Sequence, residues 1–244
     1  MPTTYEPPEK AHFLREGKGT LALQSHLRRN PDSRIAVLEV GETDLLSRYA
    51  APFLGLGTGD YSHYGRVFWE FASQGRYWTF QQGSLLASTA YGGREHLVAW
   101  DPTTNRVSGM SDAERAQIHN QDQSGQQAWS RCGVSVTLSG QLPVTIFTGE
   151  KFDKATAVIV PRDAQHLLAL YAFAVSTEFS TQVRAIDQKP IVANGTLVKV
   201  AFDLDHWQRI AAAKYPHGLP TPRSSDPTQW LFSGHPRGSD HPLH

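Results

Sequence analysis

Residues 191–207, IVANGTLVKVAFDLDHW, carry the clearest local signals in the chain. An apolar pair leads into Asn194-Gly195, a dipeptide that tolerates positive φ, and a β-branched run resumes after it. This pattern predicts a strand, a turn and a second strand over 191–200. Asp203 then occupies an N-cap position before apolar side chains that recur at helical spacing. We therefore expect a buried strand pair that leads directly into an amphipathic helix.

The segments on the N-terminal side of this stretch predict further strands and helices. Asp163 and Ser176 are the expected N-caps of two helices with apolar residues on one face. Short apolar or aromatic runs bounded by turn residues predict strands at 35–40, 67–71, 77–80, 96–100, 132–138, 142–148 and 155–160. The expected fold class is α+β, a twisted and mainly antiparallel sheet with flanking helices between residues 163 and 214.

Composition limits the partners and the compartment. The 244 residues hold equal numbers of acidic and basic side chains, so no global field attracts nucleic acid or membrane. A single cysteine, Cys132, excludes an internal disulfide framework and favours a reducing compartment. The chain has no apolar run of membrane-spanning length and no N-terminal signal segment. We expect a cytoplasmic protein without a membrane partner.

The polarity of the chain suggests three parts. Residues 1–34 form a polar, basic lead-in, residues 35–236 a single domain, and residues 237–244 a polar tail. Within the domain, residues 101–127 are strongly polar and predict a long exposed excursion, helical around 112–119 and mobile.

The glycine-rich run FLGLGTG at 53–59 permits two interpretations. Alternating glycines resemble the loops that cradle S-adenosylmethionine or a pyrophosphate, but such a loop follows a strand and opens a helix. Here Ala51-Pro52 precedes the run and turn-forming residues follow it. The run is therefore either a loop that lets its backbone approach a ligand closely or a tight structural turn.

Four segments together resemble the C-terminal region of large adenine-specific DNA methyltransferases. They are GLGTGDYSHYGRVFWE at 55–70, the run from Trp129 through RCGVSVTLSGQLPVTIFTGEKFDKATAVIV at 129–160, VRAIDQKPIVANGTLVKVAFDLDHW at 183–207 and DPTQWLFSGHP at 226–236. The family comprises type IIG restriction-modification methylases and their relatives in BREX and DISARM phage-defence systems. The resemblance implies that residues 35–236 are a target-recognition-like domain, which reads double-stranded DNA for a methyltransferase catalytic domain or subunit.

The catalytic part of that family is missing from the sequence. Its tetrapeptide, Asp or Asn followed by Pro-Pro and an aromatic residue, positions a flipped adenine, and the nearest string here is Glu6-Pro7-Pro8-Glu9. No HExxH or GxSxG motif occurs either, so we assign no catalytic residue and no metal ligand. The resemblance places S-adenosylmethionine in the associated catalytic domain and none in this chain, and it leaves open whether the chain takes part in an enzyme.

The motifs suggest which residues lie near DNA or shape its site. These are Thr58, Gly59, Asp60, Arg66, Lys189, Asn194 and Lys199. Trp69, Trp78, Trp100 and Trp230 are candidates for stacking on bases, with core or rim packing as the alternative. Two other functions stay open: a methyltransferase that holds its own cofactor at Gly55–Gly59, and a protein-docking module of a defence complex.

Overall fold

The computed structural model describes residues 44–72, 75–222 and 224–228, together with isolated positions nearer the N-terminus. The chain divides into two compact units, residues 1–42 and 43–244. In the first unit, the described positions include an ion pair in which His12 Nε2 lies 2.9 Å from Glu16 Oε1. The lead-in, the strand predicted at 35–40, the boundaries at 34 and 236, and the tail at 237–244 lie outside the described residues, apart from those isolated positions in the lead-in.

The second unit is an α+β fold, as predicted, with two open sheets. The four-stranded sheet has the order β1 (Ala50–Leu54), β9 (Thr156–Pro161), β6 (Gly133–Thr137) and β7 (Val144–Phe147), and all of its pairs are antiparallel. The smaller sheet has the order β2 (Gly65–Val67), β4 (His96–Asp101), β3 (Trp78–Gln82) and β8 (Lys151–Phe152), and β5 (Arg106–Val107) pairs with β4. Only the β3–β8 pair is parallel among the described strands.

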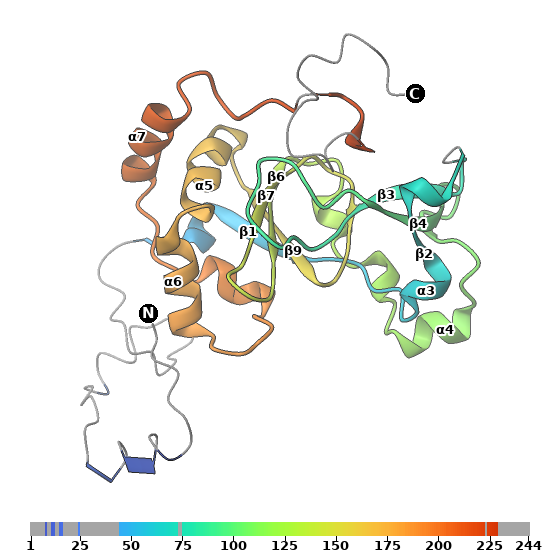
Figure 1. The fold of residues 1–244 in the computed structure, drawn as a ribbon, viewed down its shortest axis with the longest axis horizontal. Coiled ribbons are helices and arrows are strands. Elements are labelled where there is room, and N and C mark those ends of the chain that lie inside the picture. The colour runs from blue at the N-terminus through green and yellow to red at the C-terminus, as the bar shows by residue number, and fades with distance from the viewer. Residues whose placement is uncertain are drawn as a thin grey trace. The chain divides into compact units, whose positions relative to one another are not determined.

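Helices lie beside each sheet. The α-helices are α3 (Tyr61–Tyr64), α4 (Asp112–Gln117), α5 (Leu167–Ala174), α6 (Thr177–Ile186) and α7 (Leu204–Lys214). The short 3-10 helices are η2 (Leu46–Arg48), η3 (Phe68–Glu70), η4 (Gln121–Gln123), η5 (Gln126–Ala128), η6 (Ala164–His166) and η7 (Asn194–Val198). Figure 1 shows α5, α6 and α7 beside the four-stranded sheet, whereas α3 and α4 lie at the opposite end of this unit with β2 and β4.

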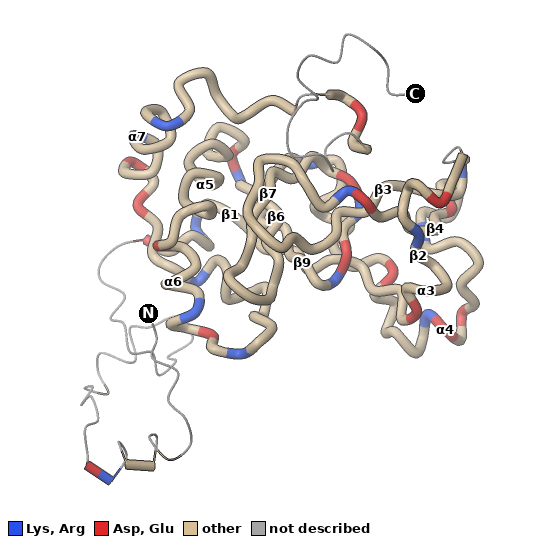
Figure 2. The backbone as a smooth tube through the Cα atoms, in the orientation of Figure 1, with Lys and Arg blue, Asp and Glu red and all other residues tan. Residues whose placement is uncertain are grey.

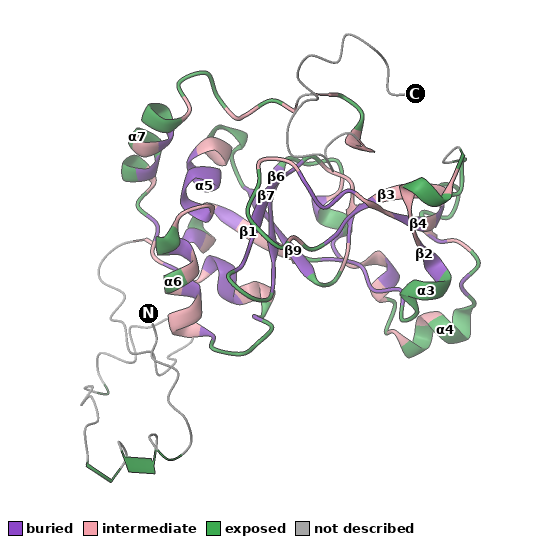
Figure 3. Cartoon of the chain, viewed as in Figure 1, coloured by how far each residue is buried: buried purple, intermediate pink, exposed green. Residues whose placement is uncertain are grey.

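The main core lies between the four-stranded sheet and α5. Every side chain of α5 from Ala169 onward is buried, as are the strands β6, β7 and β9 of the sheet, whereas β1 is buried only at Ala50 (Figure 3). Phe173 is central, because its ring centroid lies 5.4 Å from that of Phe179, 5.2 Å from Phe202 and 5.0 Å from Trp207. Burial of each such side chain contributes roughly 1.5–3 kcal/mol, so this cluster holds α6 and α7 onto α5.

The predicted caps are confirmed. Asp163, Ser176 and Asp203 each accept a hydrogen bond from a backbone N–H of the helix that follows them. The strands predicted at 77–80, 96–100, 132–138, 142–148 and 155–160 correspond to β3, β4, β6, β7 and β9.

The predicted strand pair at 191–200 is wrong. Ile191 forms only an isolated bridge with Ser139, and the 3-10 helix η7 occupies the position of the turn and most of the second strand. Gly195 does not adopt a positive φ. Val192, Thr196, Val198 and Val200 are nevertheless buried, and η7 packs on β1, β9 and α6, whereas Ile191 is exposed. Tertiary packing, and not strand pairing, therefore buries these side chains.

Two further differences concern strand positions. The run predicted as a strand at 67–71 leaves the sheet after Val67, where η3 begins, and Glu70 accepts a hydrogen bond from the Val67 N–H at 3.2 Å. Conversely, the prediction that no strand precedes the glycine-rich run is wrong, because Ala51-Pro52 lies in β1. Pro52 is tolerated there because β1 is an edge strand, where a residue without an N–H costs no ladder bond.

Candidate nucleic-acid interface

The loop that joins α6 to η7 is organised by the buried carboxylate of Asp187. One of its oxygens accepts a hydrogen bond from the Lys189 N–H at 3.2 Å, and the other accepts from the Ala193 N–H at 3.0 Å and the Thr196 hydroxyl at 3.4 Å. Burial by itself would raise the pKa of Asp187, but these hydrogen bonds and the Lys189 charge outweigh it and lower the pKa below its ordinary value. The carboxylate therefore stays ionised and closes the loop.

Arg184, in the last turn of α6, holds the same loop from the other side. Its guanidinium donates to the Lys189 carbonyl and, at 2.7 Å, to the Gly140 carbonyl in the β6–β7 connection. The Val192 N–H also donates to the Leu138 carbonyl at 2.8 Å. These contacts fix the backbone of residues 187–193, which we call the clasped loop.

The middle of the clasped loop is exposed to solvent. Gln188, Lys189 and Pro190 are exposed, and Ile191 retains 66% of its accessible surface. Asn194 follows as the half-buried first residue of η7. A fixed loop that displays Gln188 and Lys189 beside Asn194 is suited to reading base edges, since these side chains match donor and acceptor patterns in the major groove.

The seven predicted residues separate into two groups. Lys189, Asn194 and Lys199 belong to the clasped loop and η7, with Lys199 half-buried at the C-cap of η7. The other four lie around α3, which Figure 1 places far from α6 within the second unit. The structure therefore does not bring all seven together.

The group around α3 mainly shapes the local backbone. Thr58 is buried, and Gly59 has a φ of +76°. Asp60 caps α3 through the His63 N–H at 3.1 Å and accepts from the Ser62 hydroxyl at 2.6 Å. Arg66 donates to the carbonyls of Ser62 at 2.7 Å and Gly65 at 2.6 Å.

The glycine-rich run approaches the chain's own backbone. A Cβ on Gly55 would lie 2.1 Å from the Asp153 carbonyl oxygen. The N–H groups of Gly55, Leu56 and Gly57 donate to the carbonyls of Thr156, Phe152 and Gln121 at 3.3, 2.8 and 3.0 Å. These three amides serve the fold, as expected for the structural-turn interpretation.

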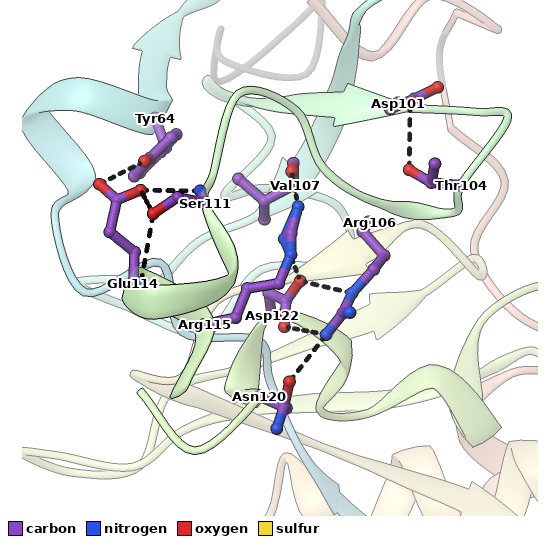
Figure 4. A network of polar contacts seen from close by, with 10 residues as sticks. All are labelled: Tyr64, Asp101, Thr104, Arg106, Val107, Ser111, Glu114, Arg115, Asn120 and Asp122. Carbon is purple, nitrogen blue, oxygen red and sulfur yellow. Dashed lines mark hydrogen bonds and ion pairs between the residues drawn. The ribbon is translucent and has the colours of Figure 1, made fainter. Parts of the chain in front are cut away.

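The polar excursion at 101–127 is anchored by a buried charge network (Figure 4). The α4 helix predicted there is present, but Asp122 beyond it is fully buried. Its carboxylate accepts two hydrogen bonds of 3.1 Å from Arg106 and one of 3.3 Å from Arg115. Both guanidinium groups are thereby committed inside the fold.

Around the clasped loop, basic residues outnumber acidic ones, although the chain as a whole has equal numbers. Arg184, Lys189 and Lys199 lie within one short stretch, and the acid of that stretch, Asp187, is buried. Figure 2 shows Lys and Arg positions at the end of α6 and along the loop that follows it. A small basic surface can attract phosphates even when the whole chain is neutral.

Sequence reasoning did not identify Asp187, Arg184 or Gln188. A signal for Asp187 existed, because an Asp side chain commonly accepts the N–H two residues later in an Asx-turn. The role of Arg184 depends on Gly140, which is distant in sequence, so no local pattern could reveal it.

Within the described residues, no group of three or more His, Cys, Asp or Glu side chains is placed to hold a metal ion. The helices of the same part of the chain are too short or too polar to cross a membrane. No protein-family model matches the chain, and no curated protein sequence is significantly similar to it.

Proposed function

We propose that this chain is the sequence-specific DNA recognition part of an adenine-specific DNA methyltransferase in a restriction-modification or phage-defence system. The observation that carries the proposal is the clasped loop, which presents Gln188, Lys189 and the adjoining Asn194 on a backbone fixed by Asp187 and Arg184. The resemblance of four sequence segments to such methyltransferases supports the same function.

The roles of the residues follow from their chemistry. Lys189 and Lys199 contact phosphates, which position the protein on the duplex without carrying sequence information. Asn194 and Gln188 contact base edges, where a carboxamide pairs in a bidentate way with adenine. The resemblance also implies that S-adenosylmethionine binds in the associated catalytic domain.

The first test is duplex binding measured by fluorescence anisotropy over a range of salt concentrations. Two to four phosphate contacts predict a slope of about 2 to 4 in log affinity against log salt. Lys189→Ala and Lys199→Ala should each lower this slope by about one unit. Lys214→Ala is the matched control, because it removes the same charge from an exposed position on α7.

The second test separates base reading from phosphate contact. Selection from a random-sequence duplex library should enrich a motif, and Asn194→Ala should relax the preference at one position of it. Incubation of the chain with labelled S-adenosylmethionine and duplex should give no methyl transfer above a heat-killed control. Transfer by the chain alone would contradict the assignment.

One observation favours a second candidate, a protein-docking module. Ile191 exposes 66% of its surface in the centre of the clasped loop, where an apolar side chain suits a protein partner. If no duplex binds even at low salt while the chain binds a methyltransferase catalytic domain through Ile191, docking replaces DNA reading.

A further inference from the structure

Lys151 in β8 carries a half-buried positive charge that no described carboxylate neutralises. Its ammonium nitrogen lies 3.9 Å from the ring centroid of Trp129 and 4.7 Å from that of Trp100, and these two rings meet nearly at a right angle. Every ion pair within the described part of the chain involves another cation. The adjacent acid, Glu150, pairs with Arg94 at 2.5 Å. The ammonium therefore rests on two ring faces instead of a counter-charge.

The surroundings of Lys151 favour the binding of an anion. Burial lowers the pKa of its amine below the ordinary value, because the charged form has lost part of its hydration. Asp153, two residues further along, uses its carboxylate to accept a hydrogen bond from the Ala155 N–H at 2.7 Å. An anion beside the ammonium would offset the cost of desolvation.

Gln81 is the neighbour of Lys151 in the smaller sheet. The two residues are register partners in the parallel β3–β8 pair, so their side chains leave the same face from strands about 4.8 Å apart. Trp100 shares this face, because Gln81 pairs with His96 and Trp100 follows His96 by four residues in β4. The strand register thus agrees with the contact between Lys151 and the Trp100 ring.

The carboxamide of Gln81 is fully buried and has no partner. Neither its Nε2 nor its Oε1 has a hydrogen bond among the described residues. The Nε1–H of Trp129, the ring nearest the Lys151 ammonium, is a further buried group without a partner in the same part of the chain. Buried polar groups of native proteins are almost always hydrogen-bonded, and an unmatched one costs free energy. These groups beside an ammonium without a counter-charge therefore indicate a ligand.

The chemistry of these groups defines the ligand. The Lys151 ammonium and Gln81 Nε2 require a negatively charged acceptor, whereas Gln81 Oε1 requires a donor. Hydrogenphosphate supplies both, since it keeps one hydroxyl beside its charged oxygens at neutral pH. Sulfate, chloride and the phosphodiesters of DNA have no proton to donate. Water could satisfy the carboxamide, but it would leave the ammonium without a counter-charge.

We propose that Lys151 and Gln81 bind an oxyanion that retains one hydroxyl, of the hydrogenphosphate type. Lys151 neutralises the charge of the anion, Gln81 Nε2 donates to a charged oxygen, and Gln81 Oε1 accepts from the hydroxyl. The site lies in the smaller sheet and uses no residue of the clasped loop, so this inference does not rest on the proposed function.

The test is isothermal titration calorimetry of the chain with inorganic phosphate and with sulfate at matched ionic strength. Phosphate should bind at least about 5-fold more tightly, because sulfate leaves the buried Oε1 of Gln81 without a donor. Lys151→Met and Gln81→Met should each weaken phosphate binding by about 10-fold or more. Lys154→Met is the matched control, because it removes the same charge from an exposed position of the same segment.

Two further measurements exclude a merely structural role. Phosphate should raise the pKa of the Lys151 amine, followed by NMR of the adjacent methylene group, because a nearby anion favours the charged form. In phosphate-free buffer, Gln81→Met should melt at or above the temperature of the unmodified chain, because the substitution removes an unmatched buried carboxamide. A clearly lower melting temperature would mean that the carboxamide is satisfied inside the fold, and the inference would be overturned.

The remaining outcomes separate this site from duplex reading and from general ionic effects. If phosphate does not bind, binds no better than sulfate, or binds Lys151→Met as well as Lys154→Met, the inference is overturned. Lys151→Met should leave duplex binding unchanged; if it weakens duplex binding but not phosphate binding, Lys151 belongs to a DNA interface and the inference is overturned. If the unmodified chain binds phosphate through Lys151 but binds no duplex, the proposed function fails and the inference stands.

Discussion

Asp187→Asn tests whether a buried carboxylate fixes the clasped loop. The substitution preserves shape, but it removes the charge and turns one acceptor oxygen into an NH2 group. Because both oxygens accept backbone N–H groups, from Lys189 at 3.2 Å and Ala193 at 3.0 Å, one pair becomes donor against donor. A hydrogen bond to a charged group contributes about 1.5–3 kcal/mol. We expect the free energy of unfolding to fall by about 2–3 kcal/mol at neutral pH.

The loss of stability in Asp187→Asn should also depend on pH. The folded-state pKa of Asp187 lies below the ordinary value of 3.8, so the folded protein binds this proton less readily than the unfolded chain. The carboxylate therefore stabilises the fold fully above pH 3.8, and this contribution is lost as the pH falls through the lower folded pKa. Asp187→Asn has no such group, so the stability gap to the unmodified chain should narrow in acid.

Urea unfolding followed by circular dichroism measures both effects. Hydrogen exchange at the Ala193 N–H reports the loop itself, and it should accelerate in Asp187→Asn. Asp205→Asn is the control, because this exposed acid in the first turn of α7 should change stability by less than about 0.5 kcal/mol. Equal stability of Asp187→Asn and the unmodified chain at neutral pH, or a gap that does not narrow on acidification, would refute the reasoning.

Four other substitutions test the fold. Val198→Asp should lower the free energy of unfolding by about 4 kcal/mol, since Val198 is buried and an unpaired charge would enter the core; an unchanged melting temperature would contradict this. Asp122→Ala should cost about 3–5 kcal/mol in urea unfolding because two guanidinium groups lose their buried partner, and near-normal stability would show that the network is dispensable. Gly195→Ala should be neutral or stabilise by up to about 1 kcal/mol, as its Cβ meets open space and its φ is not positive; a clear loss would favour the strand–turn–strand interpretation. Gly55→Ala should destabilise by about 1–3 kcal/mol, because its Cβ would meet the Asp153 carbonyl at 2.1 Å, and a neutral result would mean that β8 moves easily.

The candidate site was only partly predictable. Lys189 and Asn194 were identified from motifs, and both adjoin or belong to the clasped loop. The Asp187 carboxylate was missed although its Asx-turn with Lys189 is local, and Arg184 was missed because it acts on Gly140 in a distant turn. Of the four tryptophans considered for base stacking, Trp69 is exposed, Trp78 is half-buried, Trp100 is buried in the core and Trp230 lies outside the described residues.

The sequence by itself determined the elements whose stabilising contacts are local. Asp163, Ser176 and Asp203 cap helices through N–H groups two or three residues away, and the buried run of β9 is readable as a strand from its composition. These contacts close within a few residues, so residue type and spacing suffice to predict them.

Only the tertiary structure decided the elements that depend on distant partners. The edge strand β1 exists because it pairs with β9, which follows it by about a hundred residues, despite a proline in its centre. Residues 194–198 form a 3-10 helix because burial against β1, β9 and α6 satisfies their apolar side chains as well as a sheet would. Asp122 is buried because two arginines reach it. In each case the free energy of packing and charge pairing outweighs local propensities, which differ by about 1 kcal/mol or less per residue.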